Sequence, residues 1–308
     1  MQTQIKNNIS VSIVMTTYNG EKFLVTQIQS ILNQTWKNIN LIICDDASTD
    51  NTKNIIKDFA EQDKRITFFF NETNIGVNKN FEKGFLKAES DFIAIADQDD
   101  VWKENKIEEM LSLFYSDEII LVHSASVEFT GNGLPTTNSI SSIQMKGNDP
   151  KKLVLRNSIS GHNIIFKKSL LNIALPLPNE LYYDWWLVVN ATCAGKIDAT
   201  NIVLAFHRKH DNNVTLYNRT TNKQTRKEYL ERRNALEQFI KIEAMDESDK
   251  KFCIDLLKEL KALENKEFSM SLFIFLMKNS KVLFYYKNKK FPYFSYLKTA
   301  YRMSFAVA

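Results

Sequence analysis

The chain has 308 residues, of which 44% are hydrophobic and 25% charged, as in an ordinary globular protein. Its formal charge of +4 is too small to imply nucleic-acid binding by itself, and its 8 glycines and 5 prolines argue against a long disordered linker. Three widely spaced cysteines without a CxxC pair offer neither a disulfide framework nor a zinc site, and they suit a reducing compartment. Residues 1–10 are polar and predict no signal peptide, and no apolar run reaches the length of about 18 residues that predicts a membrane-spanning helix.

Residues 11–96 predict an alternation of strands and helices. Short apolar runs at 11–15, 40–44, 66–70 and 92–96 predict four strands. Apolar residues at helical spacing predict a helix after each of the first three strands, marked by Phe23, Ile28, Ile31 and Leu32, by Ile55, Ile56 and Phe59, and by Phe81, Phe85 and Leu86. This pattern is typical of an α/β protein with a parallel sheet and right-handed crossovers.

Polar residues follow the ends of three of these strands. Thr16 and Tyr18 follow the first strand, Asp46 the second and Asp99 the fourth. A parallel sheet brings the carboxyl ends of its strands to one edge, and open α/β sheets bind ligands there. We therefore expect these side chains to converge.

Three carboxylates, those of Asp97, Asp99 and Asp100, stand at the end of the fourth strand. They repel one another unless a cation or a donor lies between them, and Mg²⁺ and Mn²⁺ are hard cations that bind such oxygens together with phosphates. The sequence has no GxGxxG or GxxxxGK[ST] motif, so a bound phosphate would be held through the metal. A solvated acidic turn that caps the next helix is the alternative.

The second half of the chain continues the alternation less regularly. Trp102 opens a predicted helix, and the elements expected after it are a helix over 103–114, a strand at 119–123, a loop or lid at 130–150 and ordered structure at 157–166. Asp184 lies among four aromatic residues and opens an apolar helix over 187–194. A short strand at 202–206 leads to the sequence HRKH, and from about residue 224 the pattern is helical and charged.

Six stretches between residues 10 and 215 occur in a recognisable order: SIVMTTYNG, ICDDASTDNT, NIGVNKNF, ADQDDVW, YYDWW and HRKHDNNVT. Together they resemble the motifs of family 2 glycosyltransferases of the GT-A fold, and within that family the bacterial rhamnosyltransferase-like subgroup. The last motif departs from the usual pattern, with His207 in place of a tyrosine and Lys209 in place of a glutamine. The resemblance implies a mixed, mainly parallel sheet flanked by helices, with a helical C-terminal appendage.

The resemblance also implies how a sugar-nucleotide donor is bound. Thr16 and Tyr18 would lie against the base, and Asp46 would accept a hydrogen bond from N3–H of uracil or thymine. A carboxylate suits this contact because it only accepts hydrogen bonds, whereas N3–H only donates. Asp97 and Asp99 would form the DxD site, in which Asp97 holds the nucleotide and Asp99 holds the divalent metal, Mn²⁺ or Mg²⁺, that bridges the diphosphate.

Further assignments implied by the resemblance concern the chemistry. His210, together with Arg208, would face the metal or the diphosphate. Asp184 matches the catalytic base, which typically contributes about 10²–10⁴-fold in rate, and one displacement with one base inverts the anomeric centre. The aromatic residues around Asp184, among them Trp185 and Trp186, would desolvate its carboxylate, raise its pKa and stack on sugar rings of the acceptor.

Several residues also have a structural interpretation. Asp184 could serve merely as the N-cap of the helix that follows it. Asp45 is expected to be structural and to cap the second helix, whereas Asp100 could replace either member of the DxD site. His162 and His207 are interpreted mainly as interior or loop histidines.

The C-terminal region has a different composition from the rest of the chain. Residues 1–220 would form the glycosyltransferase domain, and residues 221–308 a helical, basic and aromatic region. The apolar run 272–277 is flanked by lysines that alternate with tyrosine and phenylalanine, a pattern typical of a membrane-surface segment. The alternative is an appendage that packs its aromatic residues on the main domain.

We therefore expect an inverting, metal-dependent glycosyltransferase in the cytoplasm, at the inner face of the cell membrane, that extends a surface polysaccharide on a lipid-linked acceptor. The expected donor is dTDP-rhamnose, with a UDP-sugar as the alternative because uracil and thymine present the same N3–H. A nucleotidyltransferase is disfavoured because TTYNGEK, rather than a basic or glycine-rich loop, follows the first strand. A non-catalytic carbohydrate- or nucleic-acid-binding protein is the alternative from another class; nucleic-acid binding would show a steep salt dependence.

Overall fold

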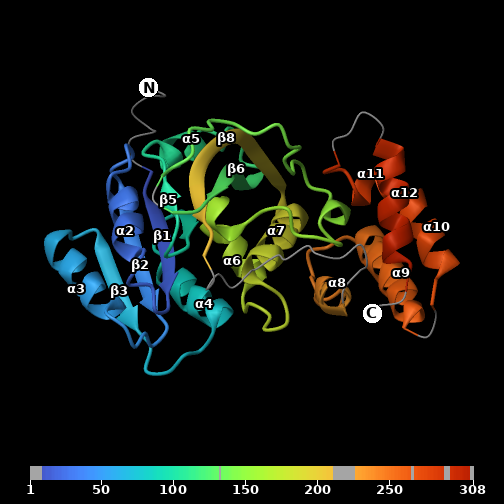
Figure 1. Ribbon diagram of the computed structural model, residues 1–308, viewed down its shortest axis with the longest axis horizontal. Coiled ribbons are helices and arrows are strands. Elements are labelled where there is room, and N and C mark those ends of the chain that lie inside the picture. Colours follow the sequence, from blue (N-terminus) through green and yellow to red (C-terminus); the bar gives the residue numbers. More distant parts are fainter. Residues whose placement is uncertain (1–8, 132, 211–225, 265–266, 288–291, 306–308) are drawn as a thin grey trace.

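The computed structural model describes residues 9–131, 133–210, 226–264, 267–287 and 292–305. Within them a single eight-stranded sheet has the order β3-β2-β1-β4-β7-β6-β8-β5 and is flanked by helices (Figure 1). Four of the seven strand pairs are parallel and three antiparallel. The expected α/β class and the mixed, mainly parallel sheet are therefore confirmed.

The first half of the chain folds as its apolar pattern predicts. Its elements are β1 Val11–Thr17, α2 Leu24–Leu32, β2 Ile39–Asp45, α3 Thr52–Gln62, β3 Ile66–Phe70, α4 Val77–Lys87 and β4 Phe92–Ala96. Successive side chains of β1 point to opposite faces of the sheet, as in any strand. Met15 belongs to the apolar cluster that includes α2, whereas Val14 belongs to the one that includes Phe81 and Phe85 of α4.

Parallel pairing aligns the ends of the first four strands. Met15 of β1 lies opposite Ile43 of β2 and Ala96 of β4. The loops that follow these strands therefore leave the sheet at the same edge, and this edge carries the candidate site.

The second half contains β5 Val101–Trp102, α5 Lys106–Leu111, β6 Ile119–Phe129, β7 Ile164–Lys167, α6 Leu171–Ala174, α7 Tyr183–Ala194 and β8 Lys196–Arg208, with short 3-10 helices η1 Pro150–Lys152, η2 Gly161–Asn163 and η3 Lys168–Leu170. The helix predicted over 103–114 is present but shorter, as α5, and the prediction that Trp102 opens it is wrong. Trp102 lies in β5, opposite Ala205 of β8, and α5 begins four residues later.

Two strands are longer than predicted. β6 extends to Phe129, and β8 spans 13 residues, because the two strands pair along most of their length, from Ile119 opposite Lys196 to Phe129 opposite Arg208. The segment 130–150, predicted as a loop, contains no strand or helix among its described residues until η1 begins at Pro150. It runs beside β8 and forms isolated bridges between Ser139 and Ile202 and between Gly147 and Ile197.

The C-terminal helices are α8 Arg226–Phe239, α9 Glu247–Leu263, α10 Met270–Lys278, α11 Ser280–Leu283 and α12 Pro292–Met303. They gather at the end of the molecule opposite β3 and α3 (Figure 1). Their apolar residues join the core of the main sheet in one cluster, in which the rings of Phe239 and Trp185 are 5.8 Å apart. The domain boundary proposed near residue 220 lies outside the described residues. None of the helices in the described part of the chain is long and apolar enough to cross a membrane.

Candidate active site at the carboxyl edge of the sheet

The loops after β1, β2 and β4 are hydrogen-bonded to one another at the carboxyl edge. The amide of Tyr18 donates to Gln98 Oε1 over 2.9 Å, and Gln98 Nε2 donates back to the carbonyl of Tyr18 over 3.1 Å. The amide of Asn19 donates to Ser48 Oγ over 2.8 Å. These contacts bring residues from three separate loops to one rim, as the sheet order predicts.

Thr16 and Tyr18 lie at this rim. Thr16 is partly exposed near the end of β1, and the side chain of Tyr18 is 48% exposed. The chain turns sharply just after them, because Asn19 has a φ of 48°, in the left-handed region. Both side chains are therefore accessible from the edge, and their contact with a nucleotide base stays a prediction.

Asp46 is buried and organises the turn before α4. Its Oδ1 accepts hydrogen bonds from Asn71 Nδ2 and the amide of Ile75, both over 2.8 Å, and its Oδ2 accepts one from the amide of Gly76 over 2.9 Å. Each carboxylate oxygen offers two lone pairs. Oδ2 is thus the atom of Asp46 that suits a further donor such as N3–H of a pyrimidine base.

The neighbouring carboxylate, Asp45, is structural as predicted, but it does not cap α3. It accepts hydrogen bonds from Thr17 Oγ1 over 2.9 Å and from the amide and the hydroxyl of Ser48. Asp45 therefore fixes the loop after β2 against the end of β1.

Asp99 and His210 form the outer part of the acidic site. Their Oδ2 and Nε2 atoms lie 2.8 Å apart, and their side chains are 13% and 19% exposed. Burial, and then the negative charges of Asp97 and Asp100, raise the pKa of Asp99 to about 6, against the pull of His210. A dication at this place would relieve the repulsion that raises the pKa.

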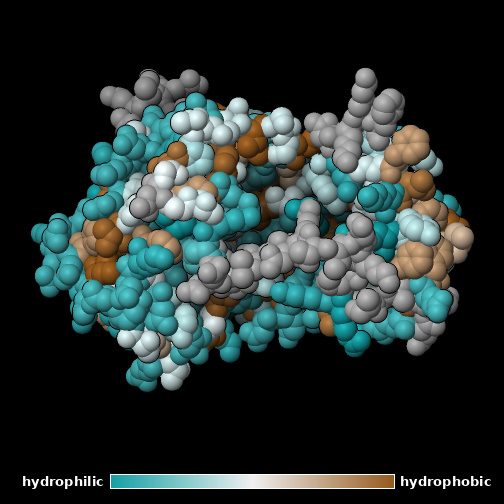
Figure 2. All heavy atoms as spheres, in the orientation of Figure 1, coloured by the Kyte–Doolittle hydropathy of each residue, from teal (hydrophilic) through white to brown (hydrophobic). Residues whose placement is uncertain are grey.

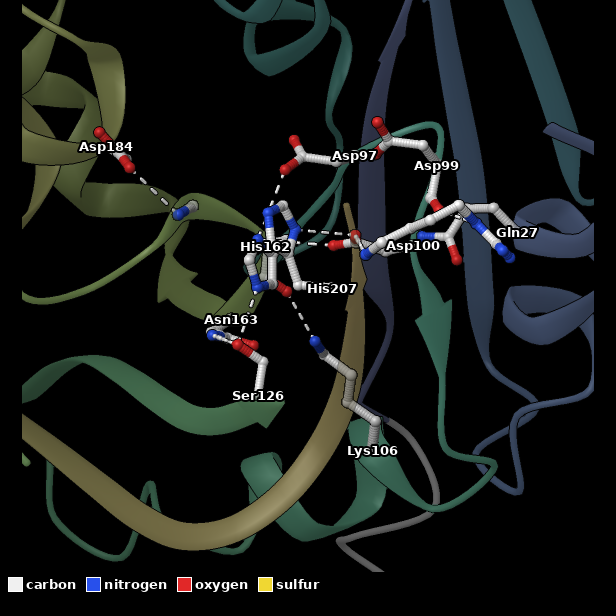
Figure 3. Close-up of polar contacts among 12 residues, drawn as sticks. Gln27, Asp97, Asp99, Asp100, Lys106, Ser126, His162, Asn163, Asp184 and His207 are labelled. Carbon is white, nitrogen blue, oxygen red and sulfur yellow. Dashed lines mark hydrogen bonds and ion pairs between the residues drawn. The ribbon is translucent and has the colours of Figure 1, made fainter. Parts of the chain in front are cut away.

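Asp100 lies deeper, beside two stacked histidines (Figure 3). Its side chain is fully buried, with Oδ1 3.0 Å from His207 Nδ1 and Oδ2 3.5 Å from His162 Nδ1. The imidazole rings of His162 and His207 stack with centroids 4.9 Å apart. Burial opposes a charge on His207, but its hydrogen bond to Asp100 prevails and raises the pKa of His207 to about 9.

Lys106 carries its ammonium into the same region from α5. Its Nζ atom donates to the carbonyl of His162 over 2.6 Å and lies 4.2 Å from the centre of the Trp102 ring. Burial lowers the pKa of Lys106 to about 7, although the charges of Asp100 and Asp97 act in the opposite direction. No sequence pattern indicated this role, because a lysine at the start of a helix is usually exposed.

Arg208 stands close to the site but is committed to the protein backbone. Its Nε donates to the carbonyl of Asp99 over 3.0 Å, and one terminal nitrogen donates to the carbonyl of Gly131 over 2.9 Å. The guanidinium also lies between the rings of Phe23 and Phe129, 4.7 and 4.4 Å from their centres. Arg208 thus holds the loop that carries Asp99, and its predicted contact with phosphate remains a prediction.

Asp184 approaches the acidic site from α7. It lies in the first turn of the helix and not at the N-cap position, which is Tyr182. Its oxygens accept hydrogen bonds from the amides of Trp185 over 2.7 Å and Gly161 over 3.2 Å. Burial raises the pKa of Asp184 to about 6, and the charge of Asp97 adds to this effect against the hydrogen bonds.

The two tryptophans beside Asp184 are largely buried. The indole of Trp185 donates to the carbonyl of Leu153 over 2.8 Å, and that of Trp186 to the carbonyl of Ala174 over 2.7 Å. These contacts show that both indole rings pack in the interior of the protein. Trp185 also lines a cavity of about 430 Å³, together with the exposed Tyr182, and contact of either tryptophan with an acceptor stays a prediction.

Residues that the sequence interpretation overlooked connect these groups. Gln98 joins two loops, Asn71 holds Asp46, and Gly161 holds Asp184. Gly161 and His162 are neighbours in the chain, so one short segment contacts both Asp184 and the pair Asp97 and Asp100. The HN pair after Gly161 was the only signal for this segment, and it does not reveal the partners.

The outer residues fit a divalent cation. Asp99 and His210 offer one carboxylate and one imidazole, which converge at the partly exposed edge. Such a pair leaves positions for phosphate oxygens, and the imidazole suits Mn²⁺ better than Mg²⁺, which takes oxygen ligands almost alone.

Comparison with known proteins gives relatives that match over part of their length. A protein of Haemophilus influenzae named as an uncharacterized glycosyltransferase is 35% identical over 158 residues, which are 48% of this chain and 63% of that protein. The Escherichia coli enzyme WfgD, named as a UDP-Glc:α-D-GlcNAc-diphosphoundecaprenol β-1,3-glucosyltransferase, is 30% identical over 180 residues, which are 58% of this chain and 69% of that enzyme. The chain thus spans about two thirds of the length of these relatives.

Solved structures match nearly the whole chain. Staphylococcus aureus TarS 1–349 in complex with UDP-GlcNAc has a TM-score of 0.62 at 15% identity, over 96% of this chain and 90% of that one. The mannosyltransferase PcManGT of Pyrobaculum calidifontis, in complex with GDP-Man and Mn²⁺, has a TM-score of 0.55 at 13% identity, over 96% and 86%. These likenesses show the fold alone, and it is the GT-A fold.

The family model described as "Glycosyl transferase family 2" matches residues 12–173, more than half of the chain. The matched stretch contains β1 to β4, the loops that meet at the carboxyl edge, and the acidic residues from Asp97 to Asp100. With its motifs in sequence order and its carboxylates gathered at one edge, the chain belongs to glycosyl transferase family 2.

Proposed function

We propose that the protein is an inverting, metal-dependent glycosyltransferase that transfers a sugar from a nucleotide diphosphate donor to a hydroxyl of a lipid-linked saccharide. One observation carries this proposal. Asp97, from the loop after β4, and Asp184, from α7, both contact the segment 161–162, because Asp184 accepts from the amide of Gly161 and Asp97 lies 3.4 Å from His162 Nδ1 (Figure 3). Asp99 lies in the same loop as Asp97 and contacts His210.

The donor site consists of the three joined loops. Thr16 and Tyr18 lie against the base, Asp46 accepts from N3–H through Oδ2, and Asp97 binds the ribose. Asp99 and His210 hold the divalent cation. When bound, the cation offsets the negative charge that the diphosphate gains as it leaves.

Asp184 acts as the base. It takes the proton of the acceptor hydroxyl while that oxygen attacks the anomeric carbon, and the bond from this carbon to the diphosphate breaks on the opposite face. The product is the inverted glycoside. A raised pKa favours this step, because a base with a pKa close to the working pH both ionises and accepts a proton readily.

The relatives support a choice of substrates. WfgD is named for a UDP-sugar donor and a diphosphoundecaprenol-linked acceptor, and TarS was solved with UDP-GlcNAc. A UDP-sugar is therefore the donor that we favour, and dTDP-rhamnose remains the alternative from the rhamnosyltransferase resemblance. Family membership disfavours the nucleotidyltransferase and the non-catalytic alternatives.

The proposed location is the cytoplasmic face of the membrane, where a lipid-linked acceptor is accessible. The three cysteines are free, in agreement with a reducing compartment. Apolar side chains that are exposed on α10 and α12 would provide a surface for the bilayer.

The test is a thermal-shift screen of UDP- and dTDP-sugars with and without Mn²⁺, followed by transfer assays with the donors that bind. A ligand that binds only the folded state raises the melting temperature, by an amount that grows with its concentration over its Kd. We expect a UDP-sugar to give the largest Mn²⁺-dependent rise. No rise with any sugar nucleotide in the presence of Mn²⁺ would refute the proposed function.

A further inference from the structure

A second cluster of metal-ligating side chains lies deeper than Asp99 and His210. It consists of Asp100 from the loop after β4, His162 from η2 and His207 from β8. One ligand atom from each lies within 4.8 Å of the others. The three side chains come from segments far apart in the chain, so the fold itself assembles the cluster.

The distances within the cluster suit a metal ion. Asp100 Oδ1 lies 3.0 Å from His207 Nδ1, and Asp100 Oδ2 lies 3.5 Å from His162 Nδ1. A tetrahedral zinc ion with bonds of about 2.1 Å separates its ligand atoms by about 3.4 Å. Small movements of the side chains would therefore place all three around one ion.

Two further features point to a ligand. Asp100 Oδ2 is completely buried and accepts no hydrogen bond from any residue that the structure describes, although a buried carboxylate oxygen normally does. The far side of the His162 ring is fixed, because Nε2 lies 3.1 Å from Ser126 Oγ. Metal-ligating histidines usually have such a partner on the ring nitrogen that faces away from the metal.

We propose that Asp100, His162 and His207 form a second metal site, which takes a borderline divalent ion such as Zn²⁺. Two imidazoles and one carboxylate are donors of zinc-type sites, whereas the outer pair of Asp99 and His210 needs phosphate oxygens to complete its shell. The inner site can bind its ion without a nucleotide. This proposal goes beyond sugar transfer and does not depend on it.

The charges around the cluster are compatible with a bound dication. Asp97 Oδ2 lies 3.4 Å from His162 Nδ1 and adds a second carboxylate. The ammonium of Lys106, on α5, donates to the backbone carbonyl of His162 over 2.6 Å, so it is bound to the chain beside the cluster.

An ion at this place would join three parts of the active site. His207 is the last residue but one of β8, Asp100 follows Asp99, and His162 follows Gly161, whose amide donates to Asp184. The inner ion thus acts as a structural clamp that positions the base relative to the donor site. Its ligands are positioning residues and do not touch the reacting atoms.

The experiment is a titration of metal-free, tag-free full-length protein with Co²⁺, without any nucleotide. Co²⁺ replaces Zn²⁺ in such sites, and it absorbs visible light strongly when its coordination number is low. The chain has only four histidines, so the background is low. The variants are His162→Asn and His207→Asn, with His210→Asn as the matched control, and melting curves verify that each is folded.

We expect one Co²⁺ per wild-type chain with visible absorption, no such binding in His162→Asn or His207→Asn, and unchanged binding in His210→Asn. Absence of binding in the wild type, binding that survives both inner variants, or loss in His210→Asn would overturn the proposal. If the inner variants do not fold, crystals of the wild type soaked in Co²⁺ decide the question. An anomalous peak between Asp100, His162 and His207 supports the site, and its absence there refutes it.

Discussion

Asp184 combines two properties that a catalytic base needs. Its oxygens are held by the amides of Trp185 and Gly161, so the carboxylate has a fixed direction. Burial raises the pKa from 3.8 to about 6, so that the group is ionised at neutral pH but still accepts a proton. Few surface aspartates combine such restraint with such a pKa.

Replacement of this carboxylate tests its role. In Asp184→Asn we expect donor affinity to stay unchanged and kcat to fall by about 10²–10⁴-fold, because an amide cannot take the proton. The raised pKa means that Asp184 is protonated below about pH 6. In the wild type, with donor and metal saturating, kcat should therefore increase as the pH rises from 5 to 7. The residual activity of the variant should lack this step, and full turnover by the variant would exclude Asp184 as the base.

The outer carboxylate gives a separate prediction. In Asp99→Asn the Mn²⁺-dependent part of donor binding should weaken by more than about tenfold, because even indirect partners of a metal contribute that much. Donor binding measured by calorimetry with and without Mn²⁺ tests this. Asp91→Asn, at an exposed position before β4, is the control and should bind as the wild type does. Equal Mn²⁺ dependence in Asp99→Asn and the control would show that the metal binds elsewhere.

At the scale of the elements, prediction from sequence succeeded where structure depends on local pattern. The strands β1 to β4 and helices α2 to α4 follow from their apolar periodicity. Trp102 was misassigned because its strand exists only through pairing with Ala205, about a hundred residues away, and no local pattern records such a partner. The candidate site was likewise predicted only in part. The resemblance of the motifs indicated Asp99 and His210, which are in contact. The contact between His162 and Asp100 depends on the fold, and no motif indicated it.

The contact between α4 and β1 is close enough to be tested by one methyl group. A Cβ at Gly84 would lie 2.4 Å from Val14 Cγ1, a buried atom in the middle of the sheet. Gly84→Ala should therefore destabilise the fold by about 1–3 kcal/mol through overpacking, although alanine is the better helix former. Thermal unfolding measures this. Gly133→Ala, where a Cβ meets nothing within 4 Å, is the control, and a Gly84→Ala protein as stable as the control would show that the helix can move away.

At the scale of the whole molecule, the C-terminal helices have two faces. Leu272 and Leu276 of α10 are completely buried in the common core, whereas Met270 and Ile274 of the same helix are 60% and 45% exposed. The packing interpretation of this region is therefore right for one face. The other face remains available for a partner, and apolar side chains gather on this end of the molecule (Figure 2).

The exposed face extends over α12, where Tyr293, Phe294, Leu297 and Tyr301 are between 37% and 71% exposed. Lys298 is exposed beside them, four positions after Phe294 and so on the same side of the helix. Aromatic and apolar side chains next to lysines suit the surface of an anionic bilayer, because each basic residue near it contributes about 1 kcal/mol.

This surface predicts the behaviour of the protein on lipid vesicles. Phe294→Glu and Leu297→Glu should each weaken binding to vesicles with anionic lipid by about tenfold or more, since a buried phenylalanine or leucine side chain contributes about 1.5–3 kcal/mol. Co-sedimentation at two salt concentrations separates the apolar from the electrostatic contribution, because only the latter weakens with salt. Leu86→Glu is the matched control, since Leu86 is 66% exposed on α4, away from this surface. Equal loss in the control, or no loss in the α12 variants, would mean that this face is not what meets the membrane.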